Sequence, residues 1–222
     1  MIVMGIDPGS RRTGWAVVRQ VGSRLQLIDL GVLIAREKAP LPERLGQLHD
    51  GLSILLSRHN PELAAVESVF HGPNTRSLVV LGQARGALLA ALGKNEAAFD
   101  EMSPAEVKKA VTGKGGATKE QVAHMVGVML GPTLTTRLQI LAEAGLPASA
   151  RLDATDAAAI AIAAIHRQRF ASRVGEGLAG KAGTAKPRTI KRGAAKSRWG
   201  AGAGARKKPP GRPGVSGGSA PG

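Results

Sequence analysis

The stretch Met1–Arg19, MIVMGIDPGSRRTGWAVVR, decides how this chain folds. An apolar run over Met1–Ile6 predicts a β-strand, and the run stops at Asp7-Pro8-Gly9, a sequence typical of a tight turn. A second apolar run over Gly14–Arg19 predicts a strand that returns beside the first, and Leu25–Ile34 predicts a third. Because the connections are so short, the three strands favour an antiparallel meander.

Helical and strand patterns alternate after this meander. Two further strands are predicted, over Leu63–Glu67 and Ala97–Met102. Apolar residues at helical spacing, together with a capping box at Ser103-Pro104-Ala105-Glu106, predict helices over Pro42–Arg58, Thr75–Leu92, from Ser103 onward, Thr118–Leu130 and Ala154–Arg169. Strands first in a meander and then alternating with helices predict an α/β fold: a mixed five-stranded sheet flanked by helices on both faces.

The composition changes near Phe170. Residues 171–222 hold twelve Lys or Arg and a single acid, Glu176, and they are otherwise rich in Gly, Ala, Pro and Ser. Such a segment has too little to bury to offset its ordering entropy, so we expect a disordered basic tail over 171–222 and a folded domain over 1–170. Most of the chain's net charge of +15 therefore belongs to the tail, and it says little about the folded surface.

Several classes of protein are disfavoured by composition. The chain has no cysteine, which excludes disulfides and thiolate metal sites. The N-terminal residues do not read as a signal peptide, and no long apolar run predicts a membrane span. These features fit a reducing compartment.

Four acids are candidates for one site. Asp7 and Glu67 end predicted strands, where open α/β sheets place ligands, and Asp153 and Asp156 lie three residues apart on one helix face. Carboxylate oxygens suit Mg²⁺, and two such ions can activate a water and stabilise the leaving oxygen in phosphodiester cleavage. Taken singly, each acid has a plainer explanation: Asp7 as a turn residue, Glu67 as a surface acid, Asp153 as a helix N-cap and Asp156 as a first-turn residue.

Five blocks of the sequence resemble the RuvC family of crossover junction endodeoxyribonucleases. They are Gly5-Ile6-Asp7-Pro8-Gly9 followed by Thr13-Gly14-Trp15, Ala65–Phe70, Leu81–Gly86, Pro104–Met125 with Lys108 and Lys119, and Asp153–Ala157. No single block is specific, but all five occur in the family's order, and together they span about residues 1–170.

The resemblance implies a ribonuclease-H-like fold and symmetric, Mg²⁺-dependent nicking of four-way (Holliday) junction DNA in recombination and repair. It implies a homodimer that works with the RuvA–RuvB branch-migration complex in the bacterial cytoplasm, at the nucleoid, without a membrane. Asp7, Glu67, Asp153 and Asp156 become the catalytic metal ligands, with two Mg²⁺ per active site and Mn²⁺ as a substitute. Some members carry His at the third position; Asp153 is a harder ligand, and the same reaction is expected.

The expected DNA contacts are basic or aromatic side chains near these acids. Lys108, Lys114 and Lys119 surround a Gly-rich stretch that would let phosphates approach. Phe70, on the loop after Glu67, could stack on an unpaired base, with Arg76 assisting at the same loop. The alternatives are that the lysines are ordinary surface residues and that Phe70 packs in the core.

Three other functions remain open on the sequence. An actin-like phosphotransferase also begins with an Asp-x-Gly hairpin, but it needs a second similar domain. A non-catalytic protein could bind DNA through the basic tail alone, and a related nuclease could act on RNA.

In the helix predicted over Thr75–Leu92, Gly82 and Gly86 could serve either packing on the sheet or contact at a dimer interface.

Overall fold

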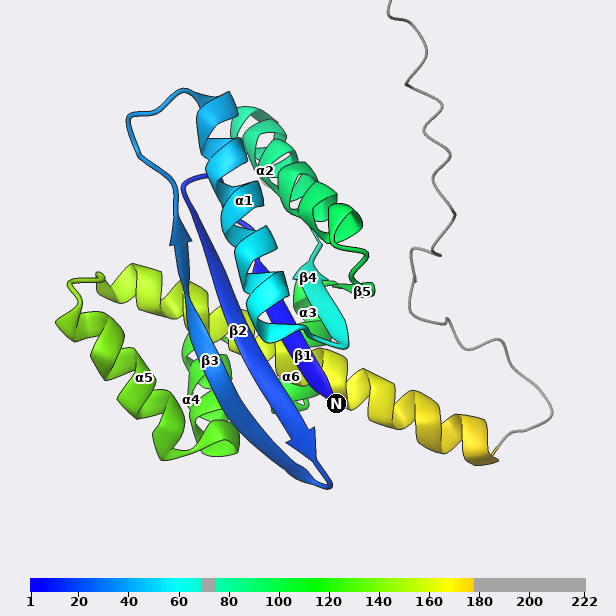
Figure 1. Ribbon diagram of the computed structural model, residues 1–222. Helices are drawn as coiled ribbons and strands as arrows, with labels where there is room; N and C mark the ends of the chain where they lie inside the picture. Colours follow the sequence, from blue (N-terminus) through cyan, green and yellow to red (C-terminus); the bar gives the residue numbers. More distant parts are fainter. Residues whose placement is uncertain (69–74, 178–222) are drawn as a thin grey trace, which may run out of the picture. The chain divides into compact units, whose positions relative to one another are not determined.

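A computed structural model describes residues 1–68 and 75–177 of the chain (Figure 1). The strands are β1 (Ile2–Asp7), β2 (Arg12–Val21), β3 (Arg24–Ile34), β4 (Leu63–Glu67) and β5 (Phe99–Met102). The helices are α1 (Leu41–His59), α2 (Thr75–Lys94), α3 (Pro104–Thr112), α4 (Lys119–Leu130), α5 (Pro132–Glu143) and α6 (Ala148–Gly177).

The five strands form one mixed sheet in the order β3-β2-β1-β4-β5. β1, β2 and β3 pair antiparallel, as the short connections predicted, and Gly22 takes a left-handed φ of 59° at the turn between β2 and β3. β4 pairs parallel to β1, and β5 pairs parallel to β4. The carboxyl ends of β1 and β4 therefore lie side by side at one edge of the sheet.

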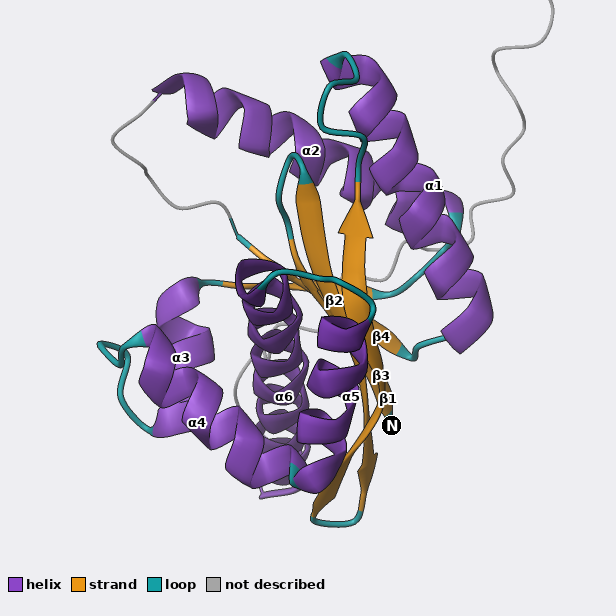
Figure 2. Ribbon diagram, turned by 90° about the vertical axis from the view of Figure 1, so that its left-hand side faces the viewer, coloured by secondary structure: helices purple, strands orange, loops and turns teal. Residues whose placement is uncertain are grey.

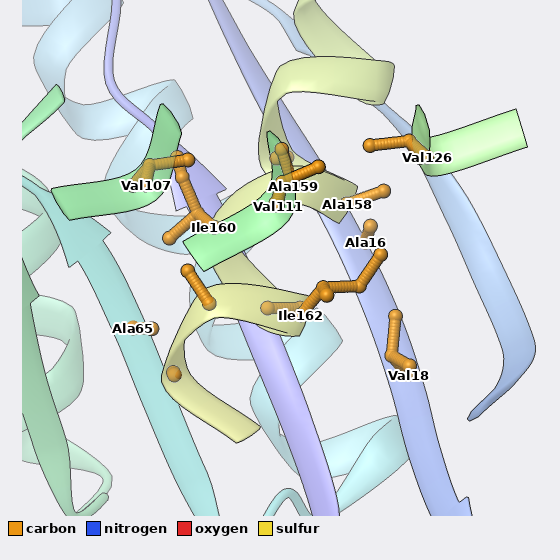
Figure 3. Close-up of a cluster of buried hydrophobic side chains, with 14 of the residues drawn as sticks. Ala16, Val18, Ala65, Val107, Val111, Val126, Ala158, Ala159, Ile160 and Ile162 are labelled. Atoms are coloured by element: carbon orange, nitrogen blue, oxygen red, sulfur yellow. The ribbon is translucent and has the colours of Figure 1, made fainter. Parts of the chain in front are cut away.

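Helices cover both faces of this sheet. Figure 1 shows α1 in front of the strands and α6 passing behind them, and Figure 2 shows α3, α4, α5 and α6 gathered on one side. The core on the α1–α2 side is built around Met4, Leu52 and Leu88, which are all fully buried. The core on the other side joins β2 and β4 to α3, α4 and α6 through small and β-branched residues (Figure 3).

α6 packs unusually close to the strands because glycine and alanine line both surfaces. A Cβ added at Gly5 of β1 would lie 2.0 Å from the Ala157 carbonyl oxygen, and one added at Gly14 of β2 would lie 2.0 Å from the Asp153 carbonyl oxygen. Ala154, Ala157, Ala158 and Ala161 of α6 are fully buried. The backbone of α6 thus rests directly on β1 and β2, which fixes where its acidic residues stand.

The predicted strands and helices are confirmed, with three differences. The last helix begins at Ala148, not at Ala154, so Asp153 and Asp156 lie inside it and neither caps it nor sits in its first turn. The sequence also failed to predict α5, a Thr-rich helix of which Leu134 is the buried residue. α6 continues to Gly177, beyond the domain boundary expected at Phe170.

None of the described helices is long and apolar enough to cross a membrane.

Candidate active site

The sheet brings Asp7 and Glu67 together. Asp7 is the last residue of β1 and Glu67 is the last residue of β4. Ile6 and Val66, the residues before them, are paired in the parallel register. The two acids therefore stand side by side at the ends of adjacent strands. This is the strand-end position at which open α/β sheets bind ligands.

α6 adds the other two carboxylates. Asp153 and Asp156 lie on one turn of α6. The backbone carbonyl of Asp153 is the group that approaches Gly14 of β2. Both side chains are about a quarter exposed, 28% for Asp153 and 26% for Asp156. Because α6 begins at Ala148, the interpretations of Asp153 as a helix N-cap and of Asp156 as a first-turn residue are wrong. The charges of both acids instead act on Asp7 at the end of β1.

A cavity of about 280 Å³ opens between these elements. Three of the four acids, Asp7, Glu67 and Asp156, line it together with Lys108 and Lys119. Asp153 is not a lining residue, but its charge acts on Asp7. The apolar part of the wall comes from α3, α4 and α6 through Pro104, Val107, Val122 and Ala159.

The acids are close enough to change each other's protonation. Burial, followed by the charges of Glu67, Asp156 and Asp153, raises the pKa of Asp7 to about 8. Burial and the charge of Asp156 also raise the pKa of Glu67. The raised pKa values mean that the nearby positive charges do not balance the negative charges of the carboxylates. A bound cation would favour their ionised form and lower these pKa values.

Two basic side chains supply part of that charge, one from β2 and one from α4. Arg12, the first residue of β2, places its Nε 3.2 Å from Asp153 Oδ2. Lys119, the first residue of α4, places its Nζ 3.4 Å from Asp156 Oδ2. Burial raises the pKa of Asp153 while Arg12 opposes that rise, and the charge of Asp156 raises the pKa of Lys119.

The donor set fits a hard divalent cation. All four side chains offer carboxylate oxygens, the ligands that Mg²⁺ and Mn²⁺ prefer. Within residues 1–68 and 75–177, no group of three or more His, Cys, Asp or Glu side chains is drawn together closely enough in this conformation to hold an ion. Two of the four carboxylates are instead engaged by Arg12 and Lys119.

The predicted DNA-contact residues separate into three groups. Lys108 and Lys119 line the cavity beside the acids. Lys114 lies at a different hollow of about 420 Å³, formed with Thr112, Gln121 and His124. Arg76 is exposed in the first turn of α2, and Phe70 lies outside the described residues.

The sequence did not predict the contacts that two arginines make at the site. One is Arg12, whose contact with Asp153 joins residues far apart in the chain. The other is Arg85 of α2, whose Nε donates to the Glu67 carbonyl oxygen at 3.3 Å while its Nη2 donates to Glu101 Oε1 at 2.6 Å. Arg85 belongs to a block that carries the family resemblance, but nothing in the local pattern signals either contact.

Comparison with known proteins agrees with this geometry. The family model described as "Crossover junction endodeoxyribonuclease RuvC" matches residues 3–166. A protein of that name from Anaeromyxobacter dehalogenans is 44% identical over 171 residues, covering 77% of this chain and 84% of its own length. Another from Azorhizobium caulinodans is 40% identical over 166 residues, covering 75% of this chain and 90% of its own length.

Solved structures give the same result. The chain is similar to "T. thermophilus RuvC in complex with Holliday junction substrate", with a TM-score of 0.65 and 31% identity over 78% of this chain and 97% of that one. At 16% identity, the yeast mitochondrial Holliday junction resolvase Ydc2 shares the fold with a TM-score of 0.58. With its sheet, its strand-end acids and these matches over nearly all of the described residues, the chain belongs to the RuvC family of crossover junction endodeoxyribonucleases.

Proposed function

We propose that this chain resolves Holliday junctions in recombination and repair by hydrolysing DNA phosphodiester bonds, with Asp7, Glu67, Asp153 and Asp156 as ligands of two Mg²⁺ ions. The observation that carries the proposal is the convergence of Asp7, Glu67 and Asp156, from β1, β4 and α6, at one cavity that Lys108 and Lys119 also line. Asp153 stands outside the lining, but its charge acts on Asp7. Family membership supplies the reaction class.

The roles of the side chains follow from their positions. When bound, Mg²⁺ activates a water for in-line attack and stabilises the leaving oxygen, and Mn²⁺ can replace it. Asp7 and Glu67 would hold the ions from the ends of β1 and β4, and Asp153 and Asp156 would hold them from α6. Lys108 and Lys119, which line the same cavity, would contact DNA phosphates near the bond that is cut.

Lys119 has a second task in this scheme. Its Nζ lies 3.4 Å from Asp156 Oδ2, and its side chain is 76% exposed. A cation that binds Asp156 competes with this contact, and a long exposed lysine can move toward a DNA phosphate at little cost. Metal binding and DNA binding would therefore each release Lys119 from the carboxylate.

We also propose a homodimer that places two such sites on the two strands of a junction. The exposed face of α2 fits a two-fold contact: Val79 is 55% exposed, and a Cβ added at Gly82 or Gly86 meets nothing within 4 Å. The two glycines therefore do not serve packing on the sheet of their own chain. A C2 pair of α2 helices would bury this face and relate the active sites by symmetry.

Partners and location follow from family membership. We propose that the dimer acts with the RuvA–RuvB branch-migration complex in the bacterial cytoplasm, at the nucleoid, where four-way junctions form. Lys114, Arg76 and Phe70 are the further residues that we expect to touch the junction.

A cleavage assay tests the core of the proposal. The purified chain should nick a synthetic four-way DNA junction symmetrically in the presence of Mg²⁺ or Mn²⁺ and should leave it intact in chelator. Asp7→Asn, Glu67→Gln, Asp153→Asn and Asp156→Asn should each abolish most cutting while retaining junction binding, because the metal needs the charge and recognition rests on lysines and shape.

Matched controls sharpen this assay. Asp50→Asn removes an exposed acid of α1 and should leave cutting unchanged. A four-way RNA junction of the same sequence tests the rival substrate, and preferential RNA cutting would refute the proposal. A wild-type rate from any of the four variants would remove that residue from the ligand set.

A further inference from the structure

Arg12 makes two contacts on one turn of α6. Its Nε lies 3.2 Å from Asp153 Oδ2, and its Nη1 donates to Ser149 Oγ at 3.0 Å. Ser149 and Asp153 are four residues apart and therefore face the same side of the helix. The guanidinium thus bridges the two side chains from the first residue of β2.

Arg12 is better held than Lys119, the basic side chain that pairs with Asp156. The side chain of Arg12 is 34% exposed and contacts both Asp153 and Ser149, whereas that of Lys119 is 76% exposed and, among residues 1–68 and 75–177, pairs with Asp156 alone. The Arg12 backbone is also fixed, because it pairs with Ile34 in the sheet and its carbonyl lies against Gly9. When a cation enters the site, Lys119 can leave, and Arg12 is expected to stay.

We propose that Arg12 is a positioning residue for Asp153, an inference that rests on the proposed function of Asp153 as a metal ligand. Arg12 lies beside Oδ2 of Asp153, so Oδ1 would be the oxygen left free to hold a metal ion. Without Arg12 the carboxylate could rotate and offer both oxygens.

The same contact has opposite effects on metal affinity and on catalysis. The guanidinium is a positive charge close to the ion, so it weakens metal binding. The fixed orientation of Asp153 keeps the ion in the geometry that cutting needs, and a loosely held ligand lowers the rate even when the site is full. A contact that only tied β2 to α6 would affect neither quantity in the folded protein.

Two substitutions separate charge from geometry. Arg12→Met removes both, and Arg12→Lys keeps the charge but cannot bridge two acceptors with the planar fork of an arginine. Arg36→Met is the matched control, because Arg36 pairs with Glu43 on the exposed part of α1 and contacts none of the four acids. The measurements are Mn²⁺ affinity by calorimetry without DNA, and junction cutting at saturating Mn²⁺.

We expect Arg12→Met to bind Mn²⁺ about threefold more tightly than the unsubstituted chain and to cut about tenfold more slowly. Arg12→Lys should return the affinity to within about twofold of the unsubstituted chain and should still cut about tenfold more slowly. Arg36→Met should change neither value. This pattern would support the positioning role.

Three results would overturn it. One is an Arg12→Met chain whose affinity and saturated rate both match the unsubstituted chain, even if its thermal stability is lower. Another is weaker Mn²⁺ binding by Arg12→Met, and the third is full recovery of the rate by Arg12→Lys. If the unsubstituted chain bound no Mn²⁺ and cut no junction, the proposed function itself would fail, which is a separate outcome.

Discussion

Gly14 of β2 lies directly against the backbone of Asp153 on α6: a Cβ at position 14 would stand 2.0 Å from the Asp153 carbonyl oxygen. A backbone carbonyl cannot move aside as a flexible side chain can. The absence of a side chain at Gly14 therefore sets the distance between β2 and the turn of α6 that carries Asp153 and Asp156.

Gly14→Ala should destabilise the fold and impair the site together. Overpacking of this kind costs about 1–3 kcal/mol, and the strain falls on the turn of α6 that carries two of the acids. Chemical denaturation should show the loss of stability, and junction cutting should fall below the level that the remaining folded fraction explains.

Gly46→Ala is the control for this substitution. Gly46 lies in α1, and a Cβ there meets nothing within 4 Å, so alanine should stabilise the helix by about 0.5–1 kcal/mol. Cutting should not change. If Gly14→Ala had the stability and activity of the unsubstituted chain, the close approach would not position the acids.

Asp7→Asn should stabilise the metal-free protein, by an amount that depends on pH. The pKa of Asp7 is about 8 in the folded state against 3.8 for an ordinary aspartate, with burial as the main cause. Between these values the unfolded chain has released a proton that the folded chain still holds. The free energy of unfolding therefore falls as pH rises through this window, by up to about 1.4 kcal/mol for each pH unit.

The Asn variant holds no such proton, so its advantage over the unsubstituted chain should grow from pH 4 to pH 8 and then level off. Urea unfolding in chelator at several pH values measures this difference, with Asp50→Asn as the exposed control. Mg²⁺ should reverse the order, because the ion favours the charged carboxylate. If the free energy of unfolding had the same pH dependence in the Asn variant and in the unsubstituted chain, the pKa of Asp7 would not be raised in the folded state.

Gly86→Arg should separate the proposed dimer. The position is exposed on α2 and has nothing within 4 Å of an added Cβ, so a single chain accommodates the arginine without repacking. Two facing helices would not, because the substitution puts a long charged side chain into their contact. Light scattering should show a dimer for the unsubstituted chain, a monomer for Gly86→Arg and a dimer for Gly46→Arg on α1.

Coordinated cutting should be lost with the dimer. A monomer has one active site, so the variant should nick one strand of a junction at a time. An unsubstituted chain that is a strict monomer at micromolar concentration and still nicks both strands together would contradict the symmetric scheme.

The strands could be predicted from local sequence because each is an apolar run with a clear end. The apolar run before Asp7 and the one before Glu67 each stop at the acid, and strands that alternate with helices predict a mixed sheet. The parallel pairing of β1 with β4 was not predicted and comes from the structure. The residues themselves made Asp7, Glu67, Asp153 and Asp156 candidates for one site, and the family resemblance gave the same four. The resemblance was needed for support, since the spacing of two aspartates on a helix is common.

Other features could not be predicted, for identifiable reasons. α6 begins earlier than expected because Ala148–Leu152 shows no apolar periodicity, and the Thr-rich α5 has little buried surface to give it a helical pattern. The contact between Arg12 and Asp153 depends on how closely α6 approaches β2. That distance is set by Gly14 and the alanines of α6 acting together, which no local stretch of sequence reveals.

Removing residues 178–222 should leave the fold and cutting intact and should change how the chain binds DNA. This segment holds eleven Lys or Arg and no Asp or Glu, whereas all four acids and the described helices and strands precede it. Each lost phosphate contact lowers the steepness of the log–log salt dependence on duplex DNA by about 0.9. Affinity for any DNA should therefore fall and become less sensitive to salt.

Preference for a junction over a plain duplex should survive the truncation, because lysines and arginines in a Gly- and Pro-rich segment carry no information about junction shape. Salt titrations of both lengths of the chain against junction and duplex measure this. A full-length variant with Gln at the eleven basic positions controls for length, and it should behave like the truncated chain. Equal salt slopes for all three proteins would mean that the segment has no role in DNA binding. Loss of junction preference on truncation would contradict the placement of recognition in the part of the chain that carries the acids.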